Sequence, residues 1–188
     1  MRIIAGSAKG RLLLSPKGMS TRPTLDRVKE SLFSILQFSL PNTRVLDLYA
    51  GTGSLGLEAL SRGASHAVFN DSDKRCAETI QANIEALGFS AQATLLQMDA
   101  MMALARLRGG QPFDIVFFDP PYQQGENGAL HALFEYALLA ANCMVVVEHA
   151  WNDAPKEEPS LFRLTDRRKY RDTGISFFTH STGKDARI

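Results

Sequence analysis

The chain has 188 residues, of which 45% are hydrophobic and 22% charged, as expected for one soluble globular domain with a full core. It contains no apolar run long enough to predict a membrane span, and its amino terminus lacks the apolar core of a signal peptide, so we expect a cytoplasmic protein. The net charge of +1 is unevenly distributed: residues 1–29 carry +6, residues 160–188 carry +4 and residues 30–159 carry −9. Basic ends suit phosphate contacts, although ordinary solvated surfaces explain them equally well.

Apolar periodicity predicts strands and helices that alternate along most of the chain. Two short apolar runs, 3–5 and 11–14, predict an amino-terminal hairpin, and Thr24 is placed to cap the first helix. The expected helices cover 25–38, 54–62, 73–87, 100–108 and 127–140, and the expected strands cover 44–49, 66–70, 93–97, 113–118, 143–148, 161–170 and 174–180.

These elements predict an α/β fold with a doubly wound, mostly parallel seven-stranded sheet of the Rossmann-like type. Little more than a turn separates the last two strands, which must therefore pair antiparallel. We expect one domain, in which residues 1–20 form a hairpin extension and residues 21–188 form the core. Ligands of such sheets bind beyond the carboxyl ends of the strands, and the motifs described next follow strand ends.

The first core strand leads into the glycine-rich turn DLYAGTGSLG, which begins at Asp47. The GxGxxG pattern within it is a weak signal that fits a dinucleotide site or a tight turn without a ligand. Asp47 favours S-adenosylmethionine over NAD, because a carboxylate would repel a pyrophosphate but attract a cationic amino group. The residues expected to hold this cofactor are Asp47, Tyr49, Ala50, Gly51, Thr52 and Gly53.

Acidic residues at the ends of the next two strands complete the expected cofactor site. Asp71 lies about twenty residues beyond the glycine turn, where an acid can accept both ribose hydroxyls, and Ser72 lies beside it. Asp73 is a natural cap for the following helix. Asp99 and Ala100 follow the third strand and are placed to meet the adenine amino group, although Asp99 can equally cap a helix.

The strand at 113–118 ends in the tetrapeptide Asp119-Pro120-Pro121-Tyr122. A carboxylate and a fixed carbonyl can accept hydrogen bonds from an amino group on a flat ring, and a tyrosine ring can stack on that ring. Accepting both N–H bonds favours the tetrahedral nitrogen that attacks a methyl group, so the motif predicts methyl transfer to the exocyclic amino group of a nucleobase. A base in a duplex would first have to be flipped out, and a plain turn is the alternative.

With these motifs, the chain resembles the RsmD-type ribosomal RNA guanine-N2 methyltransferases, which have the class I adenosylmethionine-dependent fold. The shared segments are MRIIAG at 1–6, KGR at 9–11, TRPTLDRVKESLF at 21–33, DLYAGTGSLGLEALSR at 47–62, DPPY at 119–122 and VEH at 147–149. The resemblance implies methylation of N2 of one guanine in 16S ribosomal RNA within an assembling 30S particle.

The resemblance also assigns candidate substrate residues. Arg22 and Thr24 belong to the family's upstream signature, and Lys9 and Arg11 belong to an amino-terminal segment that helps take up RNA in that family. Arg22 would meet RNA or brace the catalytic turn, and a salt bridge at the edge of the core is an equal alternative. We expect a monomer without a metal, because Cys76 and Cys143 lack metal-ligand spacing.

Two departures from the family pattern and several rival functions stay open. Asn70 replaces an apolar residue before the ribose acid, and Arg171 stands where the family often has glycine. The catalytic turn fits adenine N6 as well as guanine N2, whereas a protein glutamine methyltransferase would usually carry Asn in place of Asp119. A non-catalytic RNA-binding factor would be expected to have a degraded glycine turn. Glu148, His149 and Trp151 either border the pocket or serve capping and packing.

Overall fold

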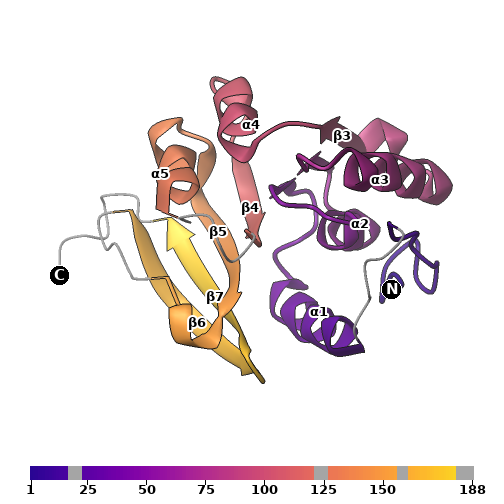
Figure 1. Ribbon diagram of the computed structural model, residues 1–188, viewed down its shortest axis with the longest axis horizontal. Helices are drawn as coiled ribbons and strands as arrows, with labels where there is room; N and C mark the ends of the chain where they lie inside the picture. Colours follow the sequence, from indigo (N-terminus) through magenta and orange to yellow (C-terminus); the bar gives the residue numbers. More distant parts are fainter. Residues whose placement is uncertain (17–22, 121–126, 156–160, 181–188) are drawn as a thin grey trace. The chain divides into compact units, whose positions relative to one another are not determined.

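The computed structural model describes residues 1–16, 23–120, 127–155 and 161–180, without the side chains of 23–27 and 127. Its strands are hydrogen-bonded in the order β3-β2-β1-β4-β5-β7-β6, which confirms the predicted doubly wound sheet. Figure 1 shows the helices and most of the strands, coloured along the chain. The strands are β1 (Arg44–Asp47), β2 (His66–Asn70), β3 (Ala93–Leu96), β4 (Phe113–Phe118), β5 (Leu139–Ala150), β6 (Phe162–Tyr170) and β7 (Thr173–His180). The helices are α1 (Pro23–Leu36), α2 (Ser54–Ser61), α3 (Lys74–Leu87), α4 (Ala100–Leu107) and α5 (Asn127–Glu135), with single 3-10 turns at Ser90–Gln92 and Trp151–Asp153.

The chain divides into two compact units, and the first, Met1–Asp99, contains the three parallel strands β1, β2 and β3. Asp47 at the end of β1 pairs in register with Phe69 of β2, so the carboxyl ends of these strands lie close together. Helix α2 packs tightly on β2, because a Cβ on Gly56 would lie 2.3 Å from the Phe69 ring. No helix within the described ranges is long and apolar enough to span a membrane.

The amino-terminal segment forms the predicted hairpin, although it is held as a single antiparallel bridge between Arg2 and Leu12. The Ile3 amide donates to the Arg11 carbonyl at 3.0 Å, and the Gly10 amide donates to the Ile3 carbonyl at 2.9 Å. Helix α1 begins at Pro23, so Thr24 lies in the first turn and the prediction that it caps the helix was wrong. Proline is favoured at this first position because its missing N–H would be unsatisfied there in any case.

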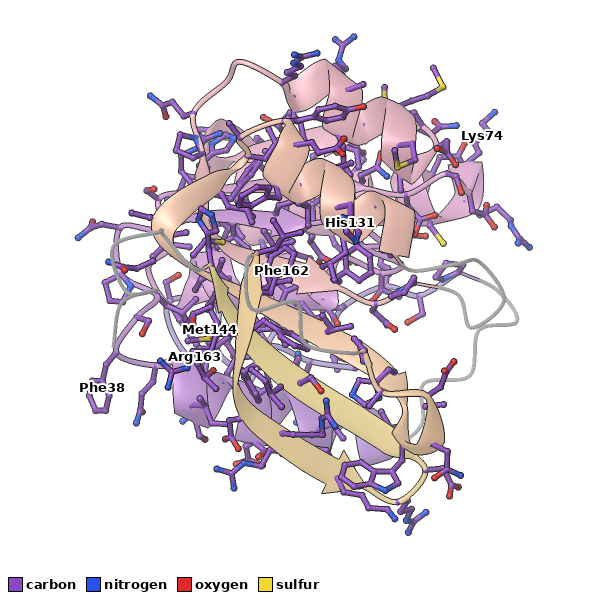
Figure 2. All side chains as sticks on the ribbon, turned by 90° about the vertical axis from the view of Figure 1, so that its left-hand side faces the viewer. Phe38, Lys74, His131, Met144, Phe162 and Arg163 are labelled. Atoms are coloured by element: carbon purple, nitrogen blue, oxygen red, sulfur yellow. The ribbon has the colours of Figure 1, made fainter. Side chains whose placement is uncertain are left out.

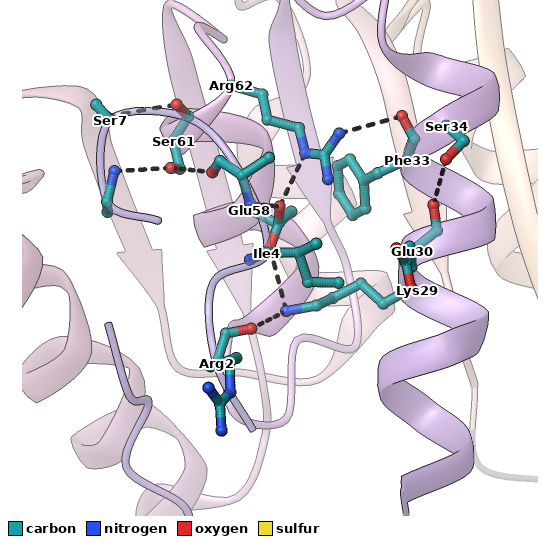
Figure 3. A network of polar contacts seen from close by, with 12 residues as sticks. Arg2, Ile4, Ser7, Lys29, Glu30, Phe33, Ser34, Glu58, Ser61 and Arg62 are labelled. Atoms are coloured by element: carbon teal, nitrogen blue, oxygen red, sulfur yellow. Dashed lines mark hydrogen bonds and ion pairs between the residues drawn. The ribbon is translucent and has the colours of Figure 1, made fainter. Parts of the chain in front are cut away.

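A buried carboxylate, Glu58 of α2, holds the hairpin on the first unit (Figure 3). Its two oxygens accept hydrogen bonds from the backbone amides of Ile4 and Ala5, at 2.8 and 3.0 Å. The same carboxylate pairs with Lys29 of α1 at 3.2 Å and with Arg62 at 2.8 Å. Because two amides and two cations share one buried anion, Glu58 connects α1, α2 and the hairpin.

One turn further along α2, Ser61 adds a second attachment for the hairpin. Its hydroxyl donates to the Ala5 carbonyl at 2.6 Å and accepts from the Ala8 amide at 2.9 Å. The Ser61 backbone carbonyl accepts the Ser7 amide at 2.7 Å. Glu58 and Ser61 therefore satisfy backbone groups of the hairpin that have no partner strand.

The second unit, Ala100–Ile188, contains β4 and β5 as a parallel pair, and β5, β7 and β6 as antiparallel neighbours. At the start of β6, neighbouring residues alternate as strand residues do, with Phe162 buried and Arg163 exposed (Figure 2). Phe162 therefore packs in the core, while the other residues of β6 are half-buried or exposed.

Helix α5 is shorter and β5 longer than the sequence predicts, because the helix was expected to run to residue 140 and the strand to begin at 143. The Leu138 amide donates to the Leu133 carbonyl at 3.0 Å, and Ala137 adopts a left-handed φ of 54°, which ends the helix. Leu139 then pairs with Phe113 of β4. The apolar run that continues from the helix into the strand gave no signal of this boundary.

The turn between β6 and β7 consists of Arg171 and Asp172, flanked by the paired residues Tyr170 and Thr173. Arg171 is exposed and has a φ of 57°, in the left-handed region that glycine adopts without steric cost. The family's preference for glycine here therefore has a geometric reason, and Arg171 satisfies the same turn with some strain.

Replacing Glu58 by glutamine should strongly destabilise the protein, because the amide would direct an N–H donor at groups that are all donors. We expect Glu58→Gln to lower the free energy of unfolding, measured by urea denaturation, by about 3 kcal/mol or more. The control is Glu78→Gln, whose exposed pair with Lys74 spans 3.7 Å and should matter by less than about 1 kcal/mol. Equal stabilities of the two variants would contradict the role of Glu58.

Replacing Arg171 by glycine should stabilise the protein, because it relieves the left-handed backbone without removing buried contacts. We expect the free energy of unfolding to rise by up to about 1 kcal/mol, which corresponds to a rise in Tm of about 2–4 °C in a scanning calorimetry experiment. Arg171→Ala removes the same charge but keeps the Cβ, so its Tm should not rise. An equal rise in both variants would show that charge, and not backbone strain, is responsible.

Candidate cofactor site and catalytic turn

The glycine loop between β1 and α2 is held first by Asp47, which is only 2% exposed. Its Oδ2 accepts the backbone amide of Gly56 at 2.9 Å, which fixes the first turn of α2 beneath the loop. Burial raises the pKa of the Asp47 carboxyl to about 7, the Gly56 hydrogen bond opposes this rise, and the charge of Asp71 adds to it. A buried acid of this kind gains from any cation placed beside it.

Asp71, just beyond β2, holds the loop from the other side. Its Oδ2 accepts the Gly51 amide at 2.8 Å, and its Oδ1 accepts the Asp73 amide at 2.9 Å. Asp73 caps α3 as predicted, with its side chain accepting the Arg75 amide at 2.8 Å. The side-chain hydrogen bond from Arg75 is the main reason that the pKa of Asp73 falls to about 2.

A third polar side chain, Asn83 of α3, binds the middle of the loop. Its Nδ2 donates to the Thr52 carbonyl at 3.1 Å. Gly51 and Gly53, on either side of Thr52, have φ values of 57° and 77°, which require glycine or a strained residue. Asp71 and Asn83 thus hold the loop at Gly51 and Thr52, and Asp47 holds the first turn of the helix that follows the loop.

No sequence motif predicted a role for Asn83, Glu58 or Ser61. All three lie on the buried faces of their helices, among apolar residues such as Ile80 and Ile84 in α3. A polar residue on the apolar face of a predicted helix was the available signal, since such a side chain needs a buried partner. The identity of that partner could not be deduced from the sequence.

Asn70, the departure at the end of β2, is 1% exposed and has a structural role. Its side-chain Nδ2 donates to the Leu48 carbonyl at 3.1 Å, and its backbone carbonyl accepts the Ala50 amide at 2.9 Å. Asn70 therefore joins the end of β2 to the start of the loop. Within the described ranges, its side-chain oxygen has no hydrogen-bond partner.

The other predicted cofactor residues differ in exposure. Tyr49 is half-buried, Ala50 is buried, and Ser72 is exposed beside Asp71. Asp99 is exposed at the end of the first unit, and Ala100 is buried at the first position of α4. The structure thus brings Asp47, Asp71 and the glycine loop together by direct hydrogen bonds, while the roles of Ser72, Asp99 and Ala100 stay predictions.

Two of the four predicted catalytic residues lie in the described part of the chain. Asp119 is exposed directly after β4, and Pro120 is buried. Pro121 and Tyr122 lie outside the described residues, as does Arg22, and the side chain of Thr24 is not described. Phe118, the last residue of β4, pairs in register with Val147, so the turn begins beside the end of β5.

Two polar residues, Glu148 and His149, lie near the end of β5. Burial raises the pKa of the Glu148 carboxyl and lowers the pKa of His149. His149 is fully buried; its Nδ1 lies 2.8 Å from the Ala150 carbonyl and therefore donates, so Nε2 accepts the Ser176 hydroxyl at 2.8 Å. Arg167 in turn donates to Ser176 at 3.0 Å. His149 accordingly joins β5 to β7 by hydrogen bonding, which gives it a structural role.

The two basic residues proposed from the hairpin differ in their surroundings. Lys9 is exposed at the tip of the hairpin. Arg11 is exposed too, but one of its guanidinium nitrogens donates to the Ala86 carbonyl at 2.7 Å. A cation at this position also complements the negative end of the α3 dipole, so Arg11 has a structural function whether or not it meets RNA.

The strand order, the glycine loop joined to an acid after β2, and the Asp-Pro-Pro-Tyr motif after β4 together define a methyltransferase of the class I fold. Residues 1–179 match the family model described as "Conserved hypothetical protein 95". The chain belongs to this family, the RsmD family of ribosomal RNA methyltransferases.

Individual relatives agree with this placement. The chain is 38% identical to the "Putative rRNA methyltransferase YlbH" of Bacillus subtilis over 180 residues, which is 95% of this chain and 98% of the relative. It is 37% identical to the "Ribosomal RNA small subunit methyltransferase D" of Haemophilus influenzae over 177 residues, 93% of this chain and 90% of the relative.

Solved structures show the same fold. The one described as "Putative methyltransferase yhhF from Escherichia coli" has a TM-score of 0.85 and 33% identity, and covers 96% of this chain and 98% of its own. "SMU.776, a putative methyltransferase complexed with SAH" has a TM-score of 0.66 at 16% identity, covers 85% of this chain and 50% of its own, and shows the fold alone.

Asp47→Asn should change how stability depends on pH. The folded protein holds the Asp47 pKa above its ordinary value of 3.8, so the contribution of this carboxyl to stability is complete below about pH 4 and is lost as the pH rises through about 7. Asparagine keeps an oxygen for the Gly56 amide but does not titrate. We expect the loss of unfolding free energy between pH 5 and pH 8, measured in urea, to be smaller in the variant than in the wild type.

The matched control for this experiment is Glu135→Gln, which removes an exposed carboxyl at the end of α5. Its pH dependence should follow that of the wild type. If Asp47→Asn lost as much unfolding free energy between pH 5 and pH 8 as the wild type, the pKa of Asp47 would not be raised in the folded protein.

Proposed function

We propose that the protein transfers a methyl group from S-adenosylmethionine to the exocyclic N2 amino group of a guanine in small-subunit ribosomal RNA. The observation that carries the proposal is the glycine loop fixed by Asp71 and Asn83, with the buried carboxyl of Asp47 at the end of the preceding strand. Membership of the RsmD family supports the reaction and the class of RNA. The proposed setting is an assembling 30S particle, on which a monomer acts in the cytoplasm.

The loop fits the cofactor chemically. A Cβ on Gly51 would meet no heavy atom within 4 Å among the described residues, so the loop leaves open space where a ligand can approach its backbone. Asp71 keeps further lone pairs on both oxygens, which can accept the ribose hydroxyls. Asp47 supplies the buried negative charge that favours an amino group, and Asp99 would accept from the adenine.

S-adenosylmethionine supplies an activated methyl group, so the protein has mainly to position the attacking nitrogen. Asp119 and the Pro120 carbonyl accept the two N–H bonds of the amino group, and this draws its lone pair out of conjugation with the ring. As the nitrogen–carbon bond forms and the sulfur–carbon bond breaks, the nitrogen becomes cationic and releases one proton, which exposed Asp119 can pass to water. Tyr122 would stack on the base and hold it in line.

The RNA would be bound electrostatically by the basic ends of the chain. Residues 1–29 carry a charge of +6, and within them Lys9, Arg11 and Arg22 are the proposed phosphate contacts, with Thr24 beside them. Because the Arg11 guanidinium already donates to the Ala86 carbonyl, exposed Lys9 is the hairpin residue better placed to contact a phosphate. Such contacts make binding weaker as the salt concentration rises.

Asp119→Ala should abolish methyl transfer while cofactor binding is retained, because the substitution removes an acceptor for the amino group without touching the glycine loop. We would incubate the variant with tritiated S-adenosylmethionine and small subunits from cells that lack the endogenous activity, then identify the labelled nucleoside. The expected loss of rate is about a hundredfold or more, with a Kd for S-adenosylhomocysteine within about twofold of the wild type.

Four outcomes of the labelling and binding measurements discriminate between functions. Labelled N2-methylguanosine from the wild type supports the proposal, whereas labelled N6-methyladenosine keeps the pocket chemistry but changes the base. Normal turnover by Asp119→Ala would overturn the mechanism. Failure of the wild type to bind S-adenosylhomocysteine would favour an RNA-binding factor without catalysis.

A further inference from the structure

Asn83 binds two segments that are far apart in the sequence. Its side chain is 1% exposed on the inner face of α3. The Oδ1 atom accepts the Leu14 amide at 2.8 Å, and Nδ2 donates to the Leu14 carbonyl at 3.1 Å and to the Thr52 carbonyl at 3.1 Å. One carboxamide thus bridges the end of the amino-terminal hairpin and the middle of the glycine loop.

The three bonds fix the orientation of the carboxamide. The Leu14 amide needs an acceptor, and the two carbonyls need donors, so exchanging Oδ1 and Nδ2 would break all three bonds. The two bonds to Leu14 resemble those that a neighbouring strand would make, and they do not depend on the Leu14 side chain, which is 57% exposed. Asn83 therefore fixes the position of the backbone at residue 14.

The same face of α3 also supports the loop through packing. A Cβ on Gly53 would lie 3.3 Å from Ile80, which precedes Asn83 by one turn. Gly51, on the other side of Thr52, is bound by Asp71. Asn83 and Asp71 thus fix adjacent residues of the loop, and a shift of either residue changes the surface that the loop offers a ligand.

We propose that Asn83 is a positioning residue that couples docking of residues 11–16 to the binding-competent conformation of the glycine loop. This inference rests on the proposed function, because it takes the loop as the cofactor site. Order in the segment fixes the Asn83 carboxamide, which in turn fixes Thr52, so cofactor binding and segment docking stabilise each other. Thermodynamic linkage requires the coupling to be equal in both directions.

The test is hydrogen exchange of the full-length protein with and without S-adenosylhomocysteine, combined with calorimetric titration of that ligand. In the wild type, we expect the ligand to slow exchange in the peptide that covers residues 11–16, although the ligand itself binds at the loop. In Asn83→Ala, this protection should disappear, and the Kd should rise on the order of tenfold.

Two further variants separate coupling from simple destabilisation. Leu14→Pro removes the Leu14 amide without altering α3 or the loop, and it should also weaken ligand binding. Ser61→Ala removes two hydrogen bonds to the hairpin, at Ala5 and Ala8, but does not involve the loop, so its Kd and its protection of residues 11–16 should match the wild type.

The results distinguish failure of the inference from failure of the proposed function. If the wild type does not bind S-adenosylhomocysteine, the proposed function fails, because the loop is then not a cofactor site. A wild type that binds without protecting residues 11–16, or an Asn83→Ala variant that is folded and binds with an unchanged Kd, would overturn the coupling. An equal loss of affinity in Ser61→Ala would assign the effect to general loosening of the hairpin.

Discussion

Backbone groups outside helices and strands need hydrogen-bond partners when they are buried, and four buried polar side chains meet this need in the first unit. Glu58, Ser61, Asn70 and Asn83 are each at most 3% exposed, and each binds backbone groups of a segment that lacks regular structure. An unpaired buried amide or carbonyl costs about 1–3 kcal/mol, so these bonds decide where the hairpin and the loop can lie. The glycine loop and the amino-terminal segment depend on this constraint.

The same constraint explains why the loop suits a ligand. Its backbone is fixed by Asp71 and Asn83, whereas the open side of Gly51 is left to whatever binds there. A fixed loop loses little conformational entropy on binding, which favours affinity. The charged form of Asp47 is disfavoured by burial in the free protein, and a cationic group bound beside it would offset this desolvation cost.

The two departures from the family pattern show how far local chemistry can change within one fold. Asn70 introduces a polar group into a buried position, but it uses that group to bind the Leu48 carbonyl. Arg171 occupies a left-handed turn that glycine would fill without strain, and the turn between β6 and β7 forms nevertheless. Arg171 lies far along the chain from the glycine loop, whereas Asn70 supports the start of the loop at Leu48 and Ala50. Neither residue supplies one of the groups proposed to bind the cofactor or the base.

Much of the architecture was determined by the sequence alone. Short apolar runs located β2 and β4 at their observed bounds, and a helical pattern with a terminal glycine located α3, which Asp73 caps, to within a residue, because these signals are local. The end of α5 and the start of β5 could not be predicted, because one apolar run spans both and only the pairing of Leu139 with Phe113 separates them.

The site divides in the same way. Asp47, Asp71 and the glycines of the loop were recognisable from the sequence, because their spacing after a strand follows from the geometry of a parallel sheet. The partners of Glu58, Ser61 and Asn83 were not, since each binds backbone atoms, which carry no sequence signature, and these lie between 31 and 69 residues away. The sequence thus determined the elements and the chemistry at their ends, and the tertiary structure decided which segments those buried side chains hold together.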